Sequence, residues 1–421
     1  MKRRTGFALR TLYGPWAALP VIALEVLVLL ERGMPWRGEG LWTVENFAIA
    51  FFIVGPLCAA TAAVDASRLT RPGNIHLVLS TPHPSRAFVR AAAWCALPAM
   101  TVHLLAITAG LIVGGVTHPS VGWSGVLGAA ALQCLAVGWY VALGSALGRF
   151  AAPLLAGLAG AICAFAANLV MGEAQHNNVF RLLAVGGATI SRLGLALRPG
   201  YAAGQVALLL GTAALFLLLP MRMRGSLRIP TLRGTAVLVA IVASLVAVPH
   251  TLPQQRYSPR PFPPTMCSGS APQICFYPEH RRLANGVVPS MERLFDAARR
   301  SGYDALVPER VLESSRTFRP GGPGIRSFTA PDPLYRTGRM PIEEVAYSLV
   351  EPVHCPALSG RVAPSDRFYS RIFSVTETWL NLAVGEADRH IVGGLDVKKL
   401  TPQQTRDILD AFARCDLEGT G

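Results

Sequence analysis

Four cysteines near the C-terminus are the side chains best suited to covalent chemistry in this chain. Cys267, Cys275, Cys355 and Cys415 all follow residue 250, whereas the other four cysteines lie in apolar stretches. An even number of cysteines in an oxidising compartment predicts disulfides, and four cysteines allow three connectivities. We favour Cys267–Cys275 together with Cys355–Cys415, because the first pair closes a short local loop. Four reduced thiols are the alternative.

Two ionisable side chains, Glu25 and His103, lie inside apolar stretches. Ionisable groups at membrane depth are costly, so each one raises a functional hypothesis. Glu25 either faces a substrate path or pairs with His103. The simpler alternatives are a single hydrogen bond between helices, or a Glu25 near enough to the membrane surface to be hydrated.

Sequence signatures of catalysis are missing. The chain contains neither H-E-x-x-H nor G-x-S-x-G, and it lacks the phosphate-binding string G-x-x-x-x-G-K-[ST]. Glu279-His280 with His354 could form a metal or acid/base group, but no spacing signature supports this, and we interpret them as surface or structural residues. We therefore expect no enzyme, no catalytic residue, no metal ligand and no cofactor bound by this chain.

The first 250 residues have the composition of a helical membrane protein. Mean hydropathy is +0.38 and only 15% of residues are charged, whereas soluble domains carry about 25%. Residues 1–250 hold 18 Lys+Arg and 6 Asp+Glu, and residues 251–421 hold 21 and 19. A spanning helix needs roughly 17–25 mainly apolar residues. Seven segments are candidates: Tyr13–Leu30, Phe47–Val64, Ala91–Gly115, Val126–Leu147, Ala152–Val170, Tyr201–Leu219 and the shorter Thr235–Val248.

The distribution of basic residues predicts the orientation. With the N-terminus in the cytoplasm, 13 basic residues of residues 1–250 face the cytoplasm and 5 face outward. Cytoplasmic loops carry the excess of Lys and Arg, so this orientation is favoured over its reverse. Seven crossings then place residues 251–421 outside the cell. The same rule explains the high net charge, and we expect the lipid bilayer, not nucleic acid, as the partner of these residues.

The C-terminal residues are typical of a small folded domain. A proline-rich stalk, 251–265, precedes it. We expect a strand at Ile274–Tyr277 and helices that begin at Pro289-Ser290, Pro341, Ser365-Asp366 and Thr401-Pro402, the last with a capping box. The predicted fold is thus a polytopic α-helical membrane protein of about seven spans, with a small α/β extracytoplasmic domain at 266–421.

A short segment between the second and third predicted spans carries a recognisable pattern. Gly73-Asn74 breaks the chain, Ile75, Leu77, Val78 and Leu79 form an apolar patch, and Ser80-Thr81-Pro82 ends it before Arg86. A short amphipathic helix at the membrane surface fits this pattern, and a plain basic loop is the alternative.

The stretch from Gly73 to Arg86 resembles the segment that follows the second span in type-2 ABC exporter permeases. The resemblance extends to the layout of residues 1–220, with six spans and a mildly apolar region, Met171–Arg198, in the place where short helices dip back into the membrane. It implies a coupling helix that docks on a separate ABC ATPase subunit, which binds the ATP. The implied contact residues are Asn74, Ile75, Leu77, Leu79, Ser80, Thr81, Pro82 and Arg86.

The resemblance also implies a plasma-membrane protein of a bacterium that pairs with itself or with a sister permease. Arg outnumbers Lys 36 to 3, which indicates a high-GC genome. On this interpretation the chain divides into a six-span permease core at 1–220, a basic cytoplasmic loop and seventh span at 221–250, the stalk at 251–265, and the extracytoplasmic domain. The seventh span and the domain depart from the plain family pattern. A membrane-anchored sensor or scaffold is the alternative function, and an outward-facing hydrolase is the third.

Overall fold

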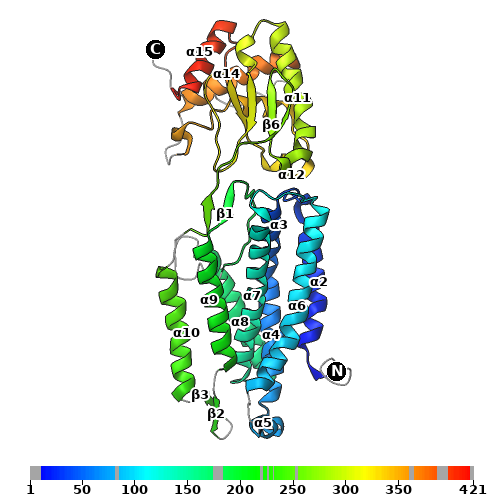
Figure 1. Ribbon diagram of the computed structural model, residues 1–421, viewed down its shortest axis with the longest axis vertical. Helices are drawn as coiled ribbons and strands as arrows, with labels where there is room; N and C mark the ends of the chain where they lie inside the picture. Colours follow the sequence, from blue (N-terminus) through cyan, green and yellow to red (C-terminus); the bar gives the residue numbers. More distant parts are fainter. Residues whose placement is uncertain are drawn as a thin grey trace.

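The computed structural model describes residues 11–80, 85–173, 184–218, 221–224, 227–230, 232–251, 255–359, 365–385 and 397–417. These residues form a bundle of long apolar helices with the C-terminal domain stacked on one end (Figure 1). The helices of the bundle are α2 (Ala18–Leu30), α3 (Gly40–Phe47), α4 (Phe51–Leu69), α5 (Pro72–Leu79), α6 (Ser85–Val113), α7 (Gly122–Gly148), α8 (Pro153–Glu173), α9 (Pro199–Leu218) and α10 (Leu232–Thr251).

Four of the described helices are long and apolar enough to cross a membrane. They are Gly40–Leu69, in which α3 and α4 run on through a short 3-10 turn, and α6, α7 and α9. Three shorter apolar helices accompany them at Gly14–Leu30, Pro153–Leu169 and Leu232–Ser244. Each of the seven predicted segments overlaps one of these helices. The second begins earlier than predicted, at Gly40, because Thr43, Glu45 and Asn46 lower the hydropathy of its first turns.

Small residues let the helices of the bundle approach closely. A Cβ added at Gly144 would lie 2.0 Å from the carbonyl oxygen of Ala59, and one added at Gly148 would lie 2.2 Å from that of Ala63. The glycine pair, one helical turn apart on α7, therefore forms the contact between α7 and α4. These two glycines therefore serve helix packing within one chain.

The two ends of the bundle differ. At the end far from the C-terminal domain lie α5 and a hairpin of β2 (Met221–Arg224) and β3 (Leu227–Pro230), so the expected basic loop is partly ordered as a hairpin (Figure 1). At the other end, β1 (Leu195–Leu197) pairs antiparallel with β4 (Tyr257–Pro259). The predicted stalk is therefore tied to the bundle through β4 instead of running free.

The C-terminal domain contains a four-stranded sheet. Its order is β5 (Met266–Ser268), β6 (Gln273–Phe276), β7 (Arg310–Glu313) and β8 (Ile325–Phe328), with β5 antiparallel to β6 and the other three strands parallel. The helices of the domain are α11 (Arg281–Arg300), α12 (Asp332–Thr337), α13 (Ile342–Val350), α14 (Asp366–Ala383) and α15 (Pro402–Ala413).

Two disulfides hold this domain. Cys267 and Cys275 face each other across β5 and β6, and Cys355 is bonded to Cys415, which ties the end of α15 to the segment after α13. These are the pairs that the spacing of the cysteines favoured.

The helices of the C-terminal domain begin at two of the predicted caps but not at Pro289. Ser365 accepts a hydrogen bond from the backbone of Phe368, and Thr401 forms both bonds of a capping box with Gln404, as predicted. The predicted start at Pro289 is wrong, because α11 begins at Arg281. A proline removes only one backbone donor, and the apolar face of α11 continues on both sides of it.

The core of the C-terminal domain includes side chains from the bundle. Trp36, from the α2–α3 connection, and Trp42, from α3, are 0% and 1% exposed and belong to the same apolar cluster as Phe276, Phe295 and Trp379. The indole of Trp42 lies edge-on to Tyr335, with ring centroids 5.2 Å apart. The domain therefore packs on the bundle through a shared core.

Candidate functional site at the junction of bundle and domain

A buried histidine between two carboxylates links the domain to the bundle. His280 lies at the end of a 3-10 turn, Pro278–His280, that follows β6. Its Nε2 is 2.8 Å from Oε1 of Glu39, and its Nδ1 is 2.5 Å from Oε1 of Glu313. All three side chains are at most 4% exposed. We call these three residues the His280 clamp.

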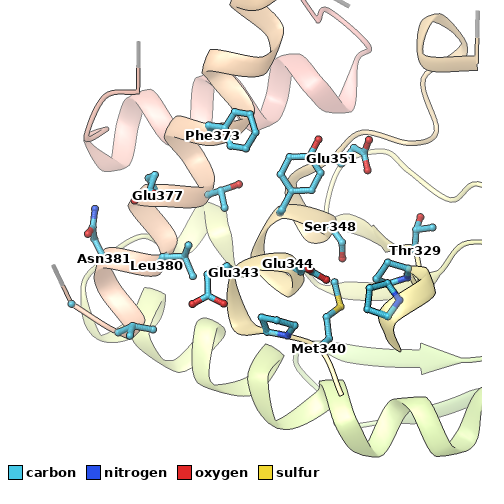
Figure 2. Close-up of a pocket in the computed structure, with 17 residues that line it drawn as sticks. Thr329, Met340, Glu343, Glu344, Ser348, Glu351, Phe373, Glu377, Leu380 and Asn381 are labelled. Atoms are coloured by element: carbon cyan, nitrogen blue, oxygen red, sulfur yellow. The ribbon is translucent and has the colours of Figure 1, made fainter. Parts of the chain in front are cut away.

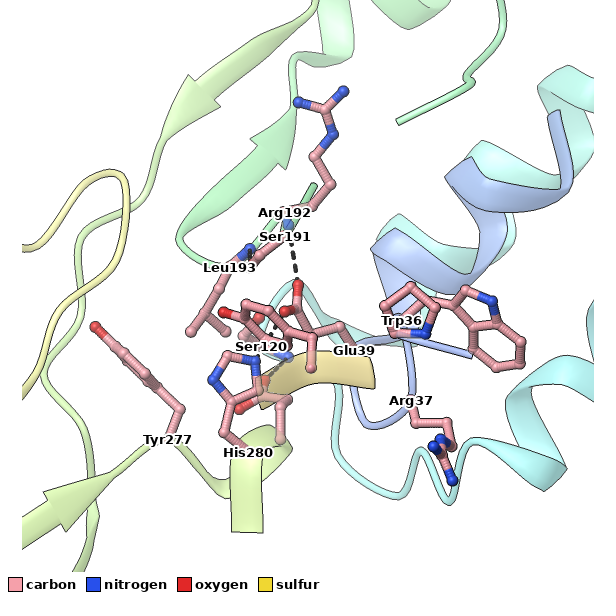
Figure 3. Close-up of polar contacts among 12 residues, drawn as sticks. Trp36, Arg37, Glu39, Ser120, Ser191, Arg192, Leu193, Tyr277 and His280 are labelled. Atoms are coloured by element: carbon pink, nitrogen blue, oxygen red, sulfur yellow. Dashed lines mark hydrogen bonds and ion pairs between the residues drawn. The ribbon is translucent and has the colours of Figure 1, made fainter. Parts of the chain in front are cut away.

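Local structure orients each carboxylate of the clamp. Glu39 is the N-cap residue of α3, and its second oxygen accepts a hydrogen bond from the backbone N–H of Arg192 at 2.9 Å. Glu313 ends β7, and its second oxygen accepts one from the backbone N–H of Tyr277 at 2.8 Å. Figure 3 shows Glu39 and His280 facing each other, with Arg192 on the far side of Glu39. Each carboxylate is thus oriented by a backbone hydrogen bond in addition to its contact with the imidazole.

The charges of the clamp decide its protonation. Burial alone would lower the pKa of His280, but the charge and hydrogen bond of Glu313, and then those of Glu39, outweigh it and raise the pKa to about 10. His280 is therefore an imidazolium at neutral pH, and both ring nitrogens donate. The clamp is a buried ion triplet that lies across the junction.

Backbone contacts complete the junction around the clamp. Glu279 Oε1 accepts a hydrogen bond from the backbone N–H of Ser120 in the α6–α7 loop at 2.7 Å. The guanidinium of Arg282 donates to the carbonyl oxygens of Pro35 and Tyr335 at 3.2 and 2.8 Å. Gly38 has φ +94°, and a Cβ there would lie 1.9 Å from the carbonyl oxygen of Glu279. Two loops of the bundle are therefore in direct contact with the turn that carries His280.

A second buried carboxylate fixes the stalk. Glu45 of α3 is 3.2 Å from the guanidinium of Arg256, and it accepts a hydrogen bond from the hydroxyl of Tyr257. Arg192 approaches the same carboxylate at 3.9 Å. The start of α3 thus holds the domain through Glu39 and the stalk through Glu45.

The predicted intramembrane residues are paired. His103 Nδ1 is 2.7 Å from Oε1 of Glu25, and its Nε2 is 2.9 Å from Oε1 of Gln133, whose amide donates to the Val44 carbonyl oxygen. Because Gln133 presents its oxygen, Nε2 of His103 carries a hydrogen and donates to it. Of the alternatives from the sequence, the structure has the pair, with Glu25 1% and His103 0% exposed.

The predicted coupling residues do not share one environment. Asn74 on α5, Ser80 at its C-cap and Arg86 in the first turn of α6 are exposed. Ile75 is 3% exposed, so it anchors α5 and is not available for contact. Leu77 and Leu79 lie on α5, whereas Thr81 and Pro82 lie outside the described residues.

The described part of Met171–Arg198 differs from the expectation. Residues 171–173 end α8, residues 174–183 lie outside the described residues, and residues 184–198 contain strand β1 and no helix. His354 lies beside the Cys355–Cys415 bond, so it and His280 have different surroundings.

Sequence reasoning missed Glu39, Glu45 and Glu313. One signal was present for the first two. Residues 1–250 contain only six acidic residues, and four of them, Glu25, Glu39, Glu45 and Asp65, are at most 4% exposed. Acidic residues are rare beside the apolar spans, so each of them is expected to have a partner in the fold. Glu313 carried no comparable signal.

Comparison of the chain with protein-family models, curated proteins and solved structures finds no match. The function must therefore be argued from the geometry.

Proposed function

We propose that this chain is the membrane-spanning subunit of an ABC exporter. It would act with a separate ATPase subunit and pair with a second permease, either another copy or a sister chain. The proposal places it in a bacterial plasma membrane with about seven crossings, the N-terminus in the cytoplasm and the C-terminal domain outside.

The position of α5 carries the proposal. This eight-residue helix connects two long apolar helices at the end of the bundle opposite the C-terminal domain (Figure 1). Val78 packs on Ala66 and Phe88, whereas Gly73, Asn74 and His76 are exposed. A short helix anchored on one side and free on the other is suited to dock in a groove of a cytoplasmic partner.

Two further features support the orientation. The excess of basic residues favours a cytoplasmic location for the α5 end. The two disulfides of the C-terminal domain fit an oxidising compartment outside the cell.

In this proposal one continuous helix connects the ATPase to the domain. Gly40–Leu69 has 30 residues and is therefore about 45 Å long at 1.5 Å per residue. Two residues separate the end of this helix from α5. Its first residue directly follows Glu39 of the clamp. Movement of α5 by the ATPase would reach His280 through this helix, and the domain would follow.

The test uses two glycines with the same local context. Gly73 and Gly200 each follow a proline at the start of a helix, α5 and α9, and a Cβ at either would meet nothing within 4 Å. Gly73→Trp places a bulky side chain on the exposed face of α5, and Gly200→Trp places it at the opposite end of the bundle. Each tagged chain is purified from membranes of the native host, and vanadate-sensitive ATP hydrolysis in the eluate is measured.

We expect the ATPase activity to co-purify with the wild-type chain and with Gly200→Trp, and to be lost with Gly73→Trp. Equal activity in the two variants would argue against docking through α5. An eluate of wild-type chain without ATPase activity would argue against the exporter.

A sensor or scaffold is the second candidate, favoured by the clamp, because a ligand bound to the domain could act on the spans through it. That function predicts a wild-type chain that purifies without an ATPase and whose domain still responds to a ligand.

A further inference from the structure

A cavity in the C-terminal domain has the size of a small-molecule site. It lies between α13 and α14 and has a volume of about 640 Å³. Sites for small ligands typically measure about 300–1,000 Å³. None of its lining residues belongs to the His280 clamp.

The walls of the cavity are largely apolar and partly aromatic. Tyr347 of α13 and Phe373 of α14 line it, with ring centroids 5.6 Å apart and planes tilted by 37°. Met340 and Leu380 extend the apolar surface (Figure 2). Such a wall fits an apolar ring, and aromatic faces also attract cations.

All the charged residues that line the cavity are acidic. They are Glu343, Glu344, Glu351 and Glu377. Within the described chain, none of the four forms an ion pair, and the lining contains no Lys, Arg or His. Burial raises the pKa of Glu351, as expected for a carboxylate without a counter-charge. The cavity therefore favours a positively charged occupant.

A buried hydroxyl provides an independent indication. Thr376 lines the cavity and is 5% exposed, and its Oγ1 has no hydrogen-bond partner among the described residues. Two residues along α14, Thr378 donates to the carbonyl oxygen of Ser374 in the ordinary helical way. A buried polar atom without a partner destabilises the fold, so a ligand N–H that reached Thr376 would be favoured.

We propose that this cavity binds a small amphiphilic cation with an aromatic body and a primary ammonium group. The body lies against Tyr347 and Phe373, and the ammonium group lies among the glutamates and donates to Thr376 Oγ1. The inference goes beyond the exporter function, since it concerns the C-terminal domain alone and holds with or without an ATPase.

Two probes with the same ring and opposite charge test the proposal. 1-Naphthylmethylammonium and 1-naphthylacetate are dialysed to equilibrium against the full chain in nanodiscs of zwitterionic lipid, with empty nanodiscs as the blank. We expect one saturable site for the cation, at least about tenfold tighter than any site for the anion, which corresponds to about 1.4 kcal/mol. Added salt should weaken binding of the cation.

Three variants locate the site. Glu351→Gln with Glu377→Gln should weaken binding of the cation about tenfold or more, and Thr376→Val by about three- to tenfold, the range of one lost hydrogen bond. Glu292→Gln, an exposed glutamate of α11 outside the cavity, should change nothing. The thermal unfolding of each variant is recorded, and if Thr376→Val does not fold, the glutamate variant decides.

Three results would overturn the proposal. They are equal binding of both probes, wild-type affinity in the glutamate variant, and no saturable binding of the cation below about 1 mM, an affinity of about 4 kcal/mol.

Discussion

Removing the imidazolium from the His280 clamp should detach the C-terminal domain from the bundle locally. In His280→Gln, two buried carboxylates, Glu39 and Glu313, lose the cation between them. The pKa of His280 is about 10 in the fold against 6.5 for a free histidine, and at about 1.4 kcal/mol per tenfold this corresponds to about 5 kcal/mol. Loss of one partner from a buried ion pair typically costs about 3–5 kcal/mol, which agrees.

Hydrogen exchange can measure this cost at individual amides. The backbone N–H groups of Arg192 and Tyr277 donate to the two carboxylates of the clamp. A local destabilisation of about 3–5 kcal/mol should speed their exchange by about a hundredfold to several thousandfold. His118→Gln, an exposed histidine of the α6–α7 loop, is the matched control and should exchange as the wild type does.

The pH dependence has a definite sign. Because folding raises the pKa of His280, its contribution to stability is complete below about 6.5 and is lost as the pH rises through about 10. After correction for intrinsic rates, protection at Arg192 and Tyr277 should therefore fall between these values.

A double variant checks the coupling. Glu39→Gln with His280→Gln should cost less than the sum of the single variants, because the double variant leaves fewer uncompensated charges. The reasoning would be refuted by strictly additive costs, or by exchange in His280→Gln that matches the His118→Gln control.

Two further predictions concern the bundle and the disulfides. Gly144→Val should prevent normal packing of α7 on α4, because its Cβ would lie 2.0 Å from the Ala59 carbonyl oxygen. The control is Gly128→Val on the same helix, where a Cβ meets nothing within 4 Å. Gel filtration should show loss of the monodisperse peak in the first variant alone, and equal peaks in both variants would contradict the contact. Replacing both cysteines of Cys355–Cys415 by alanine should destabilise the domain more than the same change at Cys267–Cys275, about 4 against about 2.5 kcal/mol from chain entropy, since the bonds join residues 60 and 8 apart. Thermal unfolding should rank the two variants in this order, and the reverse order would contradict the argument.

The sequence predicts features that depend on neighbouring residues. Hydropathy located the apolar helices, because each span is a continuous run of residues. The caps at Ser365 and Thr401 were predictable because a cap and its partner lie three residues apart. Pro289 does not mark the start of α11, because the apolar face of the helix continues on the N-terminal side of the proline.

The clamp could not be predicted in this way. Glu39 and His280 are 241 residues apart, and they meet only because the parallel strands β6 and β7 end at the bundle. Burial of a carboxylate is a property of its surroundings, and the sequence near Glu313 does not differ from that of an exposed strand end. The cavity between α13 and α14 likewise depends on how two amphipathic helices meet.

The presence of Trp36 and Trp42 in the core of the C-terminal domain has a consequence for biosynthesis. A ribosome makes these tryptophans more than 200 residues before it makes the strands and helices that enclose them. The domain thus completes its interior around two side chains that were synthesised long before it. If the domain were cut free at the stalk, it would lose two tryptophans from its interior, and truncation of a core tryptophan costs about 3–5 kcal/mol. Grafting the domain onto another anchor would therefore require the graft to bring the first loop of its own bundle with it.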